Sequence, residues 1–204
     1  RQNCHLLPCN GTEYVIPYGD EEIIFNPMSK EYMIDAVGRE DFQKLMSMLC
    51  KLQSQLVDEN TDIPLTGNFV QNRGSMINWC PIGRNAQQEE RDIFKALDNL
   101  SGIRKKYLKI LTEYILAAKM DITVKLGGNT SFDIFPNGWD KTFALNHFDG
   151  PNWAFWFVGD RCSPTGNDYE IFSALKDTGR AFEVGTPRET VDIIDFHILR
   201  EIGE

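Results

Sequence analysis

The stretch Trp153-Ala-Phe-Trp-Phe-Val158, followed by Gly159-Asp160, decides the fold class of this 204-residue chain. A continuous apolar run of this length is typical of a strand that is buried on both faces of a parallel sheet. Beyond it, the sequence predicts a polar loop, a helix from Asp168, a strand near Arg180–Val184 and a last helix from Arg188. Strands that alternate with helices indicate a doubly wound α/β core. We therefore expect the aromatic residues of the run to lie in the core and not to bind nucleic-acid bases.

The region upstream has a different pattern, in which short alternating strands and amphipathic helices follow one another. We expect a hairpin over Glu13–Phe25 with its turn at Gly19-Asp20, a helix over Arg39–Val57, two short strands within Asn68–Cys80, a helix over Gln87–Lys119 that breaks near Gly102, a second hairpin over Ile122–Phe135 and a short helix over Asp140–Phe148. Antiparallel strands covered by helices form an α+β layer. The sequence thus predicts an α+β module inserted at 22–135, and an α/β core made of residues 1–21 and 136–204.

Composition and charge exclude several classes of partner. The 21 basic and 30 acidic residues leave a formal net charge of −9, which argues against nucleic acid or an anionic membrane as the main partner. No apolar run approaches the 18 residues that a membrane-spanning helix needs. The five cysteines are scattered and lack zinc-site spacing, so reduced thiols are the simplest interpretation. We expect a cytoplasmic protein.

Two carboxylates and an amide are predicted to meet on one loop. Asp160 follows the apolar strand directly, and Asn167-Asp168 return at the start of the next helix. The carboxyl edge of a parallel sheet is where open α/β folds bind ligands, and these oxygen atoms suit Mg²⁺ together with a substrate phosphate. A turn aspartate and a helix N-cap are the alternative interpretation. Lys141, which opens a helix upstream, could neutralise a phosphoryl group at the same edge.

Three arginines form a second candidate site. Arg84 follows Pro81-Ile-Gly83, and Asn85 with Gln88 resembles a helix N-cap and capping box. A helix N-terminus beside arginines is suited to bind phosphate. Surface ion pairs of the arginines with Glu89, Glu90 or Asp92 are an equally good interpretation. The other two arginines of the site are Arg73 and Arg91.

Ser131 and Asp133 lie on one face of a predicted strand. From that face they could hydrogen-bond sugar hydroxyls. An exposed strand face explains them equally well.

Three long motifs make the sequence resemble the eukaryotic-type phosphomannomutases of the haloacid dehalogenase superfamily. They occur in the same order as in that family, and they read Pro81-Ile-Gly-Arg-Asn-Ala-Gln-Gln-Glu-Glu-Arg91, Gly127-Gly-Asn-Thr-Ser-Phe-Asp-Ile-Phe-Pro-Asn-Gly-Trp-Asp-Lys141 and Val158-Gly-Asp-Arg-Cys-Ser-Pro-Thr-Gly-Asn-Asp-Tyr-Glu-Ile-Phe172. The resemblance implies a Rossmann-like haloacid dehalogenase core, incomplete at its N-terminus, with an inserted α+β cap domain over residues 22–135.

The resemblance also implies a role for each candidate residue. In this family the positions of Arg73, Arg84, Arg91, Ser131 and Asp133 bind the sugar phosphate. By the same comparison, Lys141 is the core lysine and Asp160 is a Mg²⁺ ligand. The loop after Asp168 holds a further cation in some relatives, and Phe172 matches that loop. The sequence that follows, Ser173-Ala-Leu-Lys176, departs from the family's Thr-Asp-Pro-Arg.

One family motif is absent from these 204 residues, namely the nucleophile motif Asp-x-Asp-Gly-Thr. Without its first aspartate no aspartyl-phosphate forms, and without its second no general acid or base serves the leaving oxygen. We therefore expect the nucleophile segment to lie upstream of Arg1, and this chain to be inactive alone.

The function implied by the resemblance is the interconversion of mannose 1-phosphate and mannose 6-phosphate, for GDP-mannose biosynthesis. It implies Mg²⁺, a hexose bisphosphate activator, a hexose phosphate substrate and a homodimer formed through the cap. Two alternatives remain open: a capped sugar-phosphate phosphatase of the same superfamily, and a catalytically inactive module that binds phosphosugars or dimerises.

Overall fold

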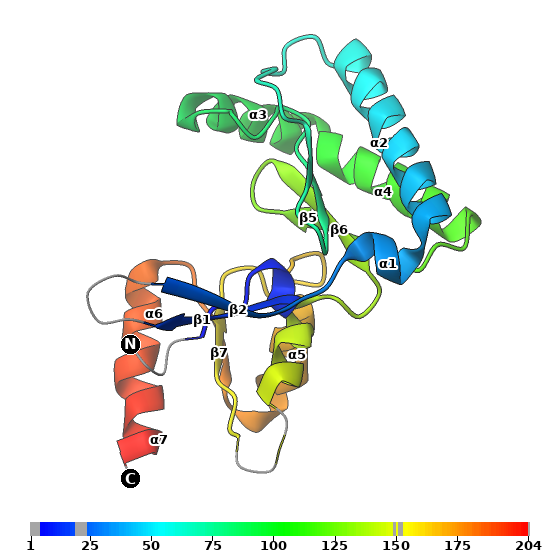
Figure 1. The fold of residues 1–204 in the computed structure, drawn as a ribbon. Coiled ribbons are helices and arrows are strands. Elements are labelled where there is room, and N and C mark those ends of the chain that lie inside the picture. Colours follow the sequence, from blue (N-terminus) through cyan, green and yellow to red (C-terminus); the bar gives the residue numbers. More distant parts are fainter. Residues whose placement is uncertain (1–4, 19–23, 149, 151–152, 204) are drawn as a thin grey trace. The chain divides into compact units, whose positions relative to one another are not determined.

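The computed structural model describes residues 5–18, 24–148, 150 and 153–203, and the chain divides into two compact units, Arg1–Trp139 and Asp140–Glu204. Figure 1 shows the course of the chain through both. The division falls close to the module boundary that the sequence predicts at residues 135 and 136. The assignment of residues 1–21 and 136–204 to one common core stays a prediction.

The first unit is built on a four-stranded antiparallel sheet with the order β3-β4-β6-β5. Its strands are β3 (Val70–Asn72), β4 (Ile77–Trp79), β5 (Ile122–Gly127) and β6 (Ser131–Pro136). The helices of this unit are α1 (Met33–Val37), α2 (Arg39–Glu59), α3 (Gln88–Ser101) and α4 (Ile103–Ala117). These strands and the three long helices confirm the predicted α+β layer, whereas the five-residue α1 is too short to show a helical period in the sequence.

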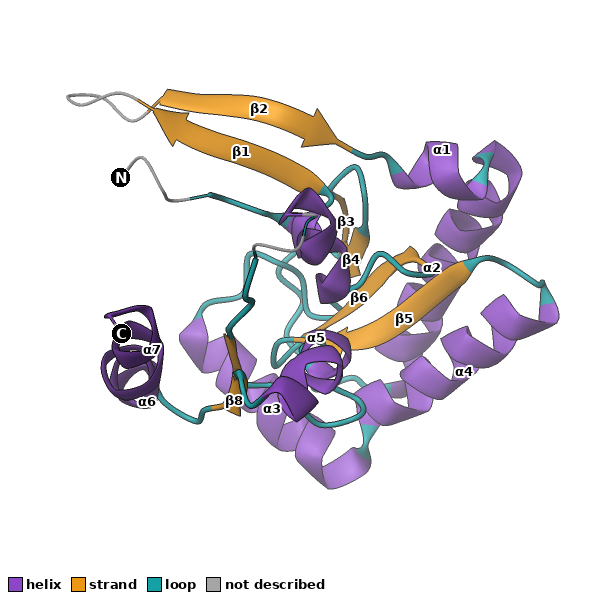
Figure 2. Ribbon diagram, turned by 90° about the horizontal axis from the view of Figure 1, so that it is seen from below, coloured by secondary structure: helices purple, strands orange, loops and turns teal. Residues whose placement is uncertain are grey.

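One core holds the sheet against α2, α3 and α4, which lie over the same face of it (Figures 1 and 2). Apolar side chains recur at helical spacing along α2, and four of them are buried, namely Leu45, Leu49, Leu52 and Leu56. Trp79 of β4 is fully buried, stacks on Phe132 of β6 at 4.7 Å between ring centroids and meets Tyr107 of α4 edge-on at 6.0 Å. Aromatic side chains therefore join sheet and helices at the centre of this core.

A separate hairpin precedes these helices. Strands β1 (Glu13–Tyr18) and β2 (Ile24–Lys30) pair antiparallel, as the sequence predicts, with a shift of register between Tyr14 and Val15. The turn predicted at Gly19-Asp20 lies outside the described residues.

The second unit contains the parallel strand pair that the sequence predicts. Strand β7 (Phe157–Gly159) pairs with β8 (Ala181–Glu183), and α5 (Tyr169–Leu175) connects them. A 3-10 helix over Lys141–Phe148 precedes β7. After β8 the chain forms α6 (Pro187–Ile193), a π-helical turn over Ile194–Ile198 and α7 (Leu199–Gly203).

The prediction of a strand buried on both faces over Trp153–Val158 is wrong. Strand β7 has three residues, all of them half-buried, and the Trp153 side chain is 57% exposed. Trp156 stacks on Phe182 with ring centroids 6.1 Å apart, so its packing partner is the neighbouring strand. In the described part of the chain, β7 belongs to a two-stranded sheet whose packing leaves it half-buried, so hydrophobicity alone overestimated the burial of this run.

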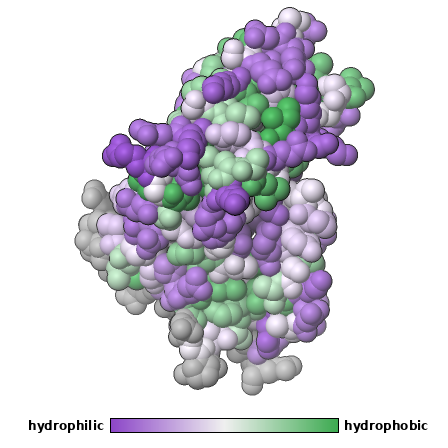
Figure 3. Space-filling model, turned by 90° about the vertical axis from the view of Figure 1, so that its right-hand side faces the viewer, coloured by the Kyte–Doolittle hydropathy of each residue, from purple (hydrophilic) through white to green (hydrophobic). Residues whose placement is uncertain are grey.

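One face of the chain carries side chains of both polarities. Figure 3 shows hydrophilic and hydrophobic residues interspersed over the face that it presents. Among the described residues, no helix combines the length and the apolar character that crossing a membrane requires. The cytoplasmic location stays a prediction.

Candidate functional site

The sheet of the first unit has two chemically different faces because side chains alternate along each strand. The register pairs Gln71 with Asn78, Asn78 with Asp133, and Asp133 with Lys125, so these four residues share one face, and Ser131 joins them two residues before Asp133. We call this set, Gln71, Asn78, Lys125, Ser131 and Asp133, the polar face. The opposite face carries Ile77, Trp79, Phe132 and Ile134 and packs on the helices.

Asn78 connects the two predicted sugar-binding residues on this face. Its Nδ2 lies 2.7 Å from Asp133 Oδ1, 3.1 Å from Ser131 Oγ and 3.3 Å from the Phe132 carbonyl oxygen. Three acceptors around one nitrogen fix the orientation of the amide. Its Oδ1 is buried and has no hydrogen-bond partner among the described residues. The sequence analysis missed Asn78, although a polar residue within the apolar stretch Met76–Cys80 was a signal that could have found it.

The predicted arginine positions lie in the same unit, and Arg91 is the most firmly held of the three. Its Nε donates to the Ala86 carbonyl oxygen at 2.8 Å, its Nη1 to Thr130 Oγ1 at 3.3 Å and its Nη2 to the Arg84 carbonyl oxygen at 3.3 Å. A guanidinium carries five N–H groups, so donors remain on Arg91 for a ligand. Arg91 therefore ties the segment of Arg84 to the end of the sheet at Thr130.

Arg73 follows β3, and its Nε donates to Gln71 on the polar face at 3.3 Å. Within the described part of the chain, neither Arg73, Arg84 nor Arg91 forms an ion pair with a carboxylate. All three residues are half-buried.

The capping box of α3 starts later than the sequence predicts. Gln87, and not Asn85, is the N-cap, and its backbone N–H donates to Glu90 Oε2 at 2.7 Å. Asn85 instead donates to the Thr66 carbonyl oxygen at 3.2 Å. The Glu90 carboxylate therefore accepts from the Gln87 backbone at the helix N-terminus, and it forms no ion pair with the three arginines.

In the second unit, the structure brings Lys141, Asp160 and Asp168 together. The Asp168 side chain is 2% exposed; its Oδ1 accepts from Lys141 Nζ, and its Oδ2 accepts the backbone N–H groups of Asp160 at 3.2 Å and Arg161 at 3.0 Å. The Asp168 carboxylate thus binds both Lys141 and the loop that follows β7. A Cβ at Gly159 would lie 2.8 Å from Asp168 Oδ2, so this approach of the carboxylate requires glycine there.

A pocket opens at the carboxyl ends of the two parallel strands. It has a volume of about 390 Å³ and is lined by residues that end or follow β7 and β8, which include Asp160, Gly185, Thr186 and Thr190. Asp160 is exposed, and its carboxylate has no hydrogen-bond or ion-pair partner among the described residues. The position confirms the expectation that this carboxylate lies at the carboxyl edge of the parallel strands.

The three predicted cation ligands differ in how much of their bonding capacity is left. Asp160 has a carboxylate that fits Mg²⁺, which usually takes one or two protein carboxylates and completes its shell with water and phosphate oxygens. Both oxygens of Asp168 already accept hydrogen bonds, and the Phe172 carbonyl oxygen accepts the Lys176 backbone N–H at the end of α5. The described residues contain no group of three or more His, Cys, Asp or Glu side chains that could hold a metal by themselves.

Burial and nearby carboxylates favour the protonated form of the thiol beside this loop. Cys162 is buried, and its burial, together with the charges of Glu183, Asp168 and Asp160, raises its pKa to about 11. A thiol with this pKa stays protonated at neutral pH.

Comparison with known proteins identifies the family. Residues 22–200 match the family described as eukaryotic phosphomannomutase. The chain is 36% identical to a phosphomannomutase of Drosophila melanogaster over 193 residues, which are 93% of this chain and 69% of that protein. It is 43% identical to a phosphomannomutase of Glycine max over 131 residues, which are 64% of this chain and 51% of that protein.

A solved structure supports the mixed α/β fold. The chain resembles an IMP-bound mutant of Plasmodium falciparum IMP-nucleotidase with a TM-score of 0.60 at 13% identity, over 95% of this chain and 48% of that one. The sequence matches agree with the three motifs, and the chain belongs to the eukaryotic phosphomannomutase family.

Proposed function

We propose that this chain serves the interconversion of mannose 1-phosphate and mannose 6-phosphate. The observation that carries the proposal is the setting of Arg91: three hydrogen bonds fix its guanidinium at the end of a polar face, and no acidic side chain among the described residues pairs with it. A fixed guanidinium with free donors is suited to a phosphate group. Its relatives named phosphomannomutase support the choice of a hexose phosphate.

In this proposal the first unit binds the sugar phosphate. Arg73, Arg84 and Arg91 hold the phosphate, while Ser131 and Asp133 accept hydrogen bonds from sugar hydroxyls. Ser131 Oγ donates to the Gly127 carbonyl oxygen at 2.9 Å and already accepts from Asn78 Nδ2 at 3.1 Å, so one lone pair of its oxygen is left to accept from a sugar hydroxyl. Asp133 is half-buried, and Asn78 holds one of its oxygens, so its orientation is set before a ligand arrives.

The second unit would serve the phosphoryl transfer. Asp160 is the residue that would hold Mg²⁺, which, when bound, neutralises charge on the transferring phosphoryl group. Lys141 holds a positive charge beside the same loop, and Asp168 fixes the position of that charge. The sequence contains no Asp-x-Asp-Gly-Thr motif, so the proposal takes the aspartate nucleophile and the general acid or base from residues beyond these 204.

The test uses the full-length protein, with its Asp-x-Asp-Gly-Thr segment, supplies mannose 1-phosphate, Mg²⁺ and a hexose bisphosphate, and follows the products by ³¹P NMR. Formation of mannose 6-phosphate supports the mutase, whereas steady release of inorganic phosphate without isomerised product supports the phosphatase. Calorimetric binding of mannose 1-phosphate without turnover supports the binding module.

A substitution ties the result to Arg91. Arg91→Lys keeps the charge but loses the planar guanidinium with its several N–H donors. We expect it to weaken binding of mannose 1-phosphate by about tenfold, the loss typical of one charged hydrogen bond. Arg188→Lys is the matched control, because Arg188 lies on α6 and its side chain is 82% exposed. Equal affinities in the two variants would contradict the proposed phosphate site.

A further inference from the structure

The turn between β5 and β6 lies where the candidate binding residues of the first unit meet, and it is held from outside by one ion pair. We propose that Asp98 and Arg104 are positioning residues: they fix this turn, Gly127–Thr130, and through it the orientation of Arg91 and Ser131. The inference rests on the proposed function for its ligand, a hexose phosphate. The contact network itself is independent of that ligand.

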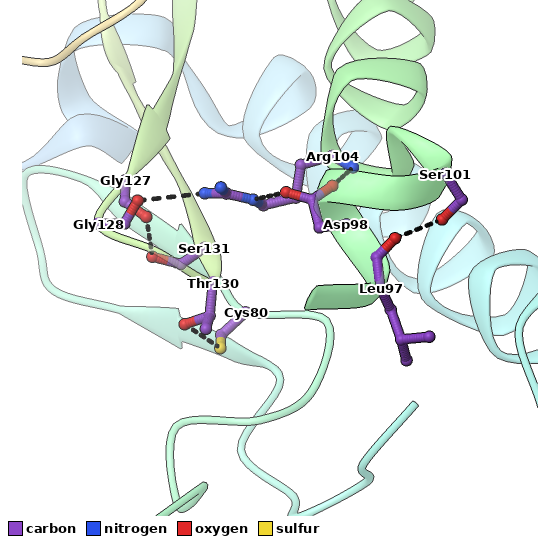
Figure 4. A network of polar contacts seen from close by, with 9 residues as sticks. All are labelled: Cys80, Leu97, Asp98, Ser101, Arg104, Gly127, Gly128, Thr130 and Ser131. Atoms are coloured by element: carbon purple, nitrogen blue, oxygen red, sulfur yellow. Dashed lines mark hydrogen bonds and ion pairs between the residues drawn. The ribbon is translucent and has the colours of Figure 1, made fainter. Parts of the chain in front are cut away.

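The ion pair is closely bonded and largely withdrawn from solvent (Figure 4). Arg104 Nε donates to Asp98 Oδ2 at 2.7 Å, and the Arg104 backbone N–H donates to Asp98 Oδ1 at 2.7 Å. The two side chains are 12% and 10% exposed. Both oxygens of Asp98 are thus used on one residue, which sets the direction of the arginine side chain as it leaves α4.

The second arm of Arg104 reaches the turn. Its Nη1 donates to the Gly128 carbonyl oxygen at 3.1 Å, and Figure 4 shows the guanidinium lying between Asp98 on one side and Gly128 on the other. Gly128 has a φ of +48°, a conformation that glycine adopts without strain. A flexible glycine at the tip of a turn needs an external contact to hold it in one place, and Arg104 supplies that contact.

Both sides of the turn are bonded to candidate binding residues. On one side Ser131 Oγ donates to the Gly127 carbonyl oxygen at 2.9 Å. On the other side Thr130, 2% exposed, accepts from Arg91 Nη1 at 3.3 Å and from Cys80 Sγ at 3.6 Å. A displacement of the turn would therefore shift an anchor of Arg91 and an anchor of Ser131 together.

The chemistry of the pair favours a positioning role over a purely stabilising one. Withdrawing an ion pair from water costs about as much as the attraction returns, so such pairs add little to net stability. A guanidinium is planar and bonds in two directions at fixed angles, which a lysine ammonium does not reproduce. The structure uses this property, because Arg104 Nε bonds Asp98 of α3 and Arg104 Nη1 bonds the turn between β5 and β6.

The experiment compares Arg104→Lys with Lys106→Gln. Arg104→Lys keeps the charge and removes the second arm. Lys106→Gln removes another ion pair of α4, the 2.6 Å contact of Lys106 with Glu59, without touching the turn. The first measurement is the dissociation constant of mannose 1-phosphate by calorimetry. The second is the rate at which the Arg91 guanidinium rotates about its Nε–Cζ bond, measured by ¹⁵N NMR without ligand.

We expect Arg104→Lys to weaken mannose 1-phosphate binding by about tenfold, as loss of a supporting contact does at other sites, and to speed rotation of the Arg91 guanidinium. Lys106→Gln should leave both quantities unchanged. We also expect Arg104→Lys and Thr130→Val to be non-additive in their effect on binding, because they act through the same turn.

Unchanged rotation of Arg91 in Arg104→Lys would overturn the inference. If the unsubstituted protein fails to bind mannose 1-phosphate, the proposed function falls, and the rotation rate still decides whether Arg104 positions Arg91. Should Arg104→Lys fail to fold, Asp98→Asn takes its place: it keeps the shape of the contact and removes the charge, and faster Arg91 rotation supports the inference while an unchanged rate overturns it.

Discussion

Among single residues, Asp168 makes the connections on which the second unit's site depends. Its carboxylate joins Lys141, which opens the 3-10 helix, to the backbone of Asp160 and Arg161 after β7. The Asp168 side chain is almost fully buried, whereas Lys141 keeps 35% of its side chain exposed. Removing the charge at position 168 therefore leaves a lysine that can partly regain water.

We predict that Asp168→Asn destabilises the protein by about 2 kcal/mol, less than the loss of a fully buried ion pair because Lys141 is partly solvated. Urea unfolding measures this difference. Asp192→Asn is the control: it breaks the exposed Arg188–Asp192 pair, and we expect a change within about 0.5 kcal/mol. An equal loss of unfolding free energy in the two variants would show that the Lys141–Asp168 contact stabilises the protein no more than an exposed ion pair does.

Some residues of the candidate site could be predicted from the sequence, and others could not. Asp160 could be placed at a strand end because Gly-Asp terminates an apolar run, and the structure puts it there beside the pocket. Asp168 was predicted as a metal ligand, and the sequence could not show that its oxygens are shared among Lys141 and two backbone N–H groups. Asn78 was missed because its role depends on cross-strand register, which a single strand does not reveal.

At the level of secondary-structure elements, two glycines in left-handed conformation are required for different reasons. Gly102 separates α3 from α4 with a φ of +67°, and its backbone N–H donates to the Asp98 carbonyl oxygen at 2.7 Å. A Cβ at Gly102 would meet nothing within 4 Å, whereas a Cβ at Gly83 would lie 2.1 Å from the Gly67 carbonyl oxygen. The first glycine is required by backbone conformation alone, and the second also by lack of space.

We predict that Gly102→Ala costs about 1 kcal/mol, the strain of a left-handed alanine. Gly83→Ala should cost more than about 3 kcal/mol, because the loop must also move apart at Gly67. Thermal unfolding of both variants measures the difference. If Gly83→Ala were as mild as Gly102→Ala, the close approach between Gly67 and Gly83 would not be required for folding.

Secondary-structure elements were predicted best where the periodic spacing of apolar residues extends over several turns. The 21 residues of α2 repeat apolar side chains over several turns, and the predicted start at Arg39 is the observed one. The break at Gly102 and the β5–β6 hairpin were also predicted. The run Trp153–Val158 was misjudged because continuous hydrophobicity carries no period, and its burial depends on neighbours that lie elsewhere in the sequence.

At the scale of the whole molecule, we expect the contact that joins α2 to α4 to contribute to stability against acid. Glu59, the last residue of α2, accepts from Lys106 Nζ at 2.6 Å, Gln55 Nε2 at 2.9 Å and Tyr107 Oη at 2.7 Å. The hydrogen bonds of Lys106, Gln55 and Tyr107 lower the pKa of Glu59 from 4.5 to about 2. Since the charged form is favoured in the folded state, this contribution is complete above pH 4.5 and is lost as the pH falls toward 2.

We predict that Glu59→Gln flattens the decline of unfolding free energy between pH 5 and pH 3, because the group that takes up a proton on unfolding is gone. Urea unfolding across this range provides the measurement. Glu113→Gln is the control, since Glu113 lies 3.8 Å from Lys109 on an exposed helix surface. A decline as steep in Glu59→Gln as in the unsubstituted protein would contradict the assignment.

The two chemically distinct faces of the four-stranded sheet have a consequence for how this family can diversify. Ile77 and Asn78 are neighbours in sequence, as are Phe132 and Asp133, yet one of each pair packs on the helices and the other lies on the polar face. If the polar face binds the sugar phosphate as proposed, substitutions at every second position change which sugar phosphate is preferred while the core stays intact. Because successive side chains of a strand point to opposite faces of the sheet, substitutions that change ligand specificity would then fall on other positions than those that maintain the core.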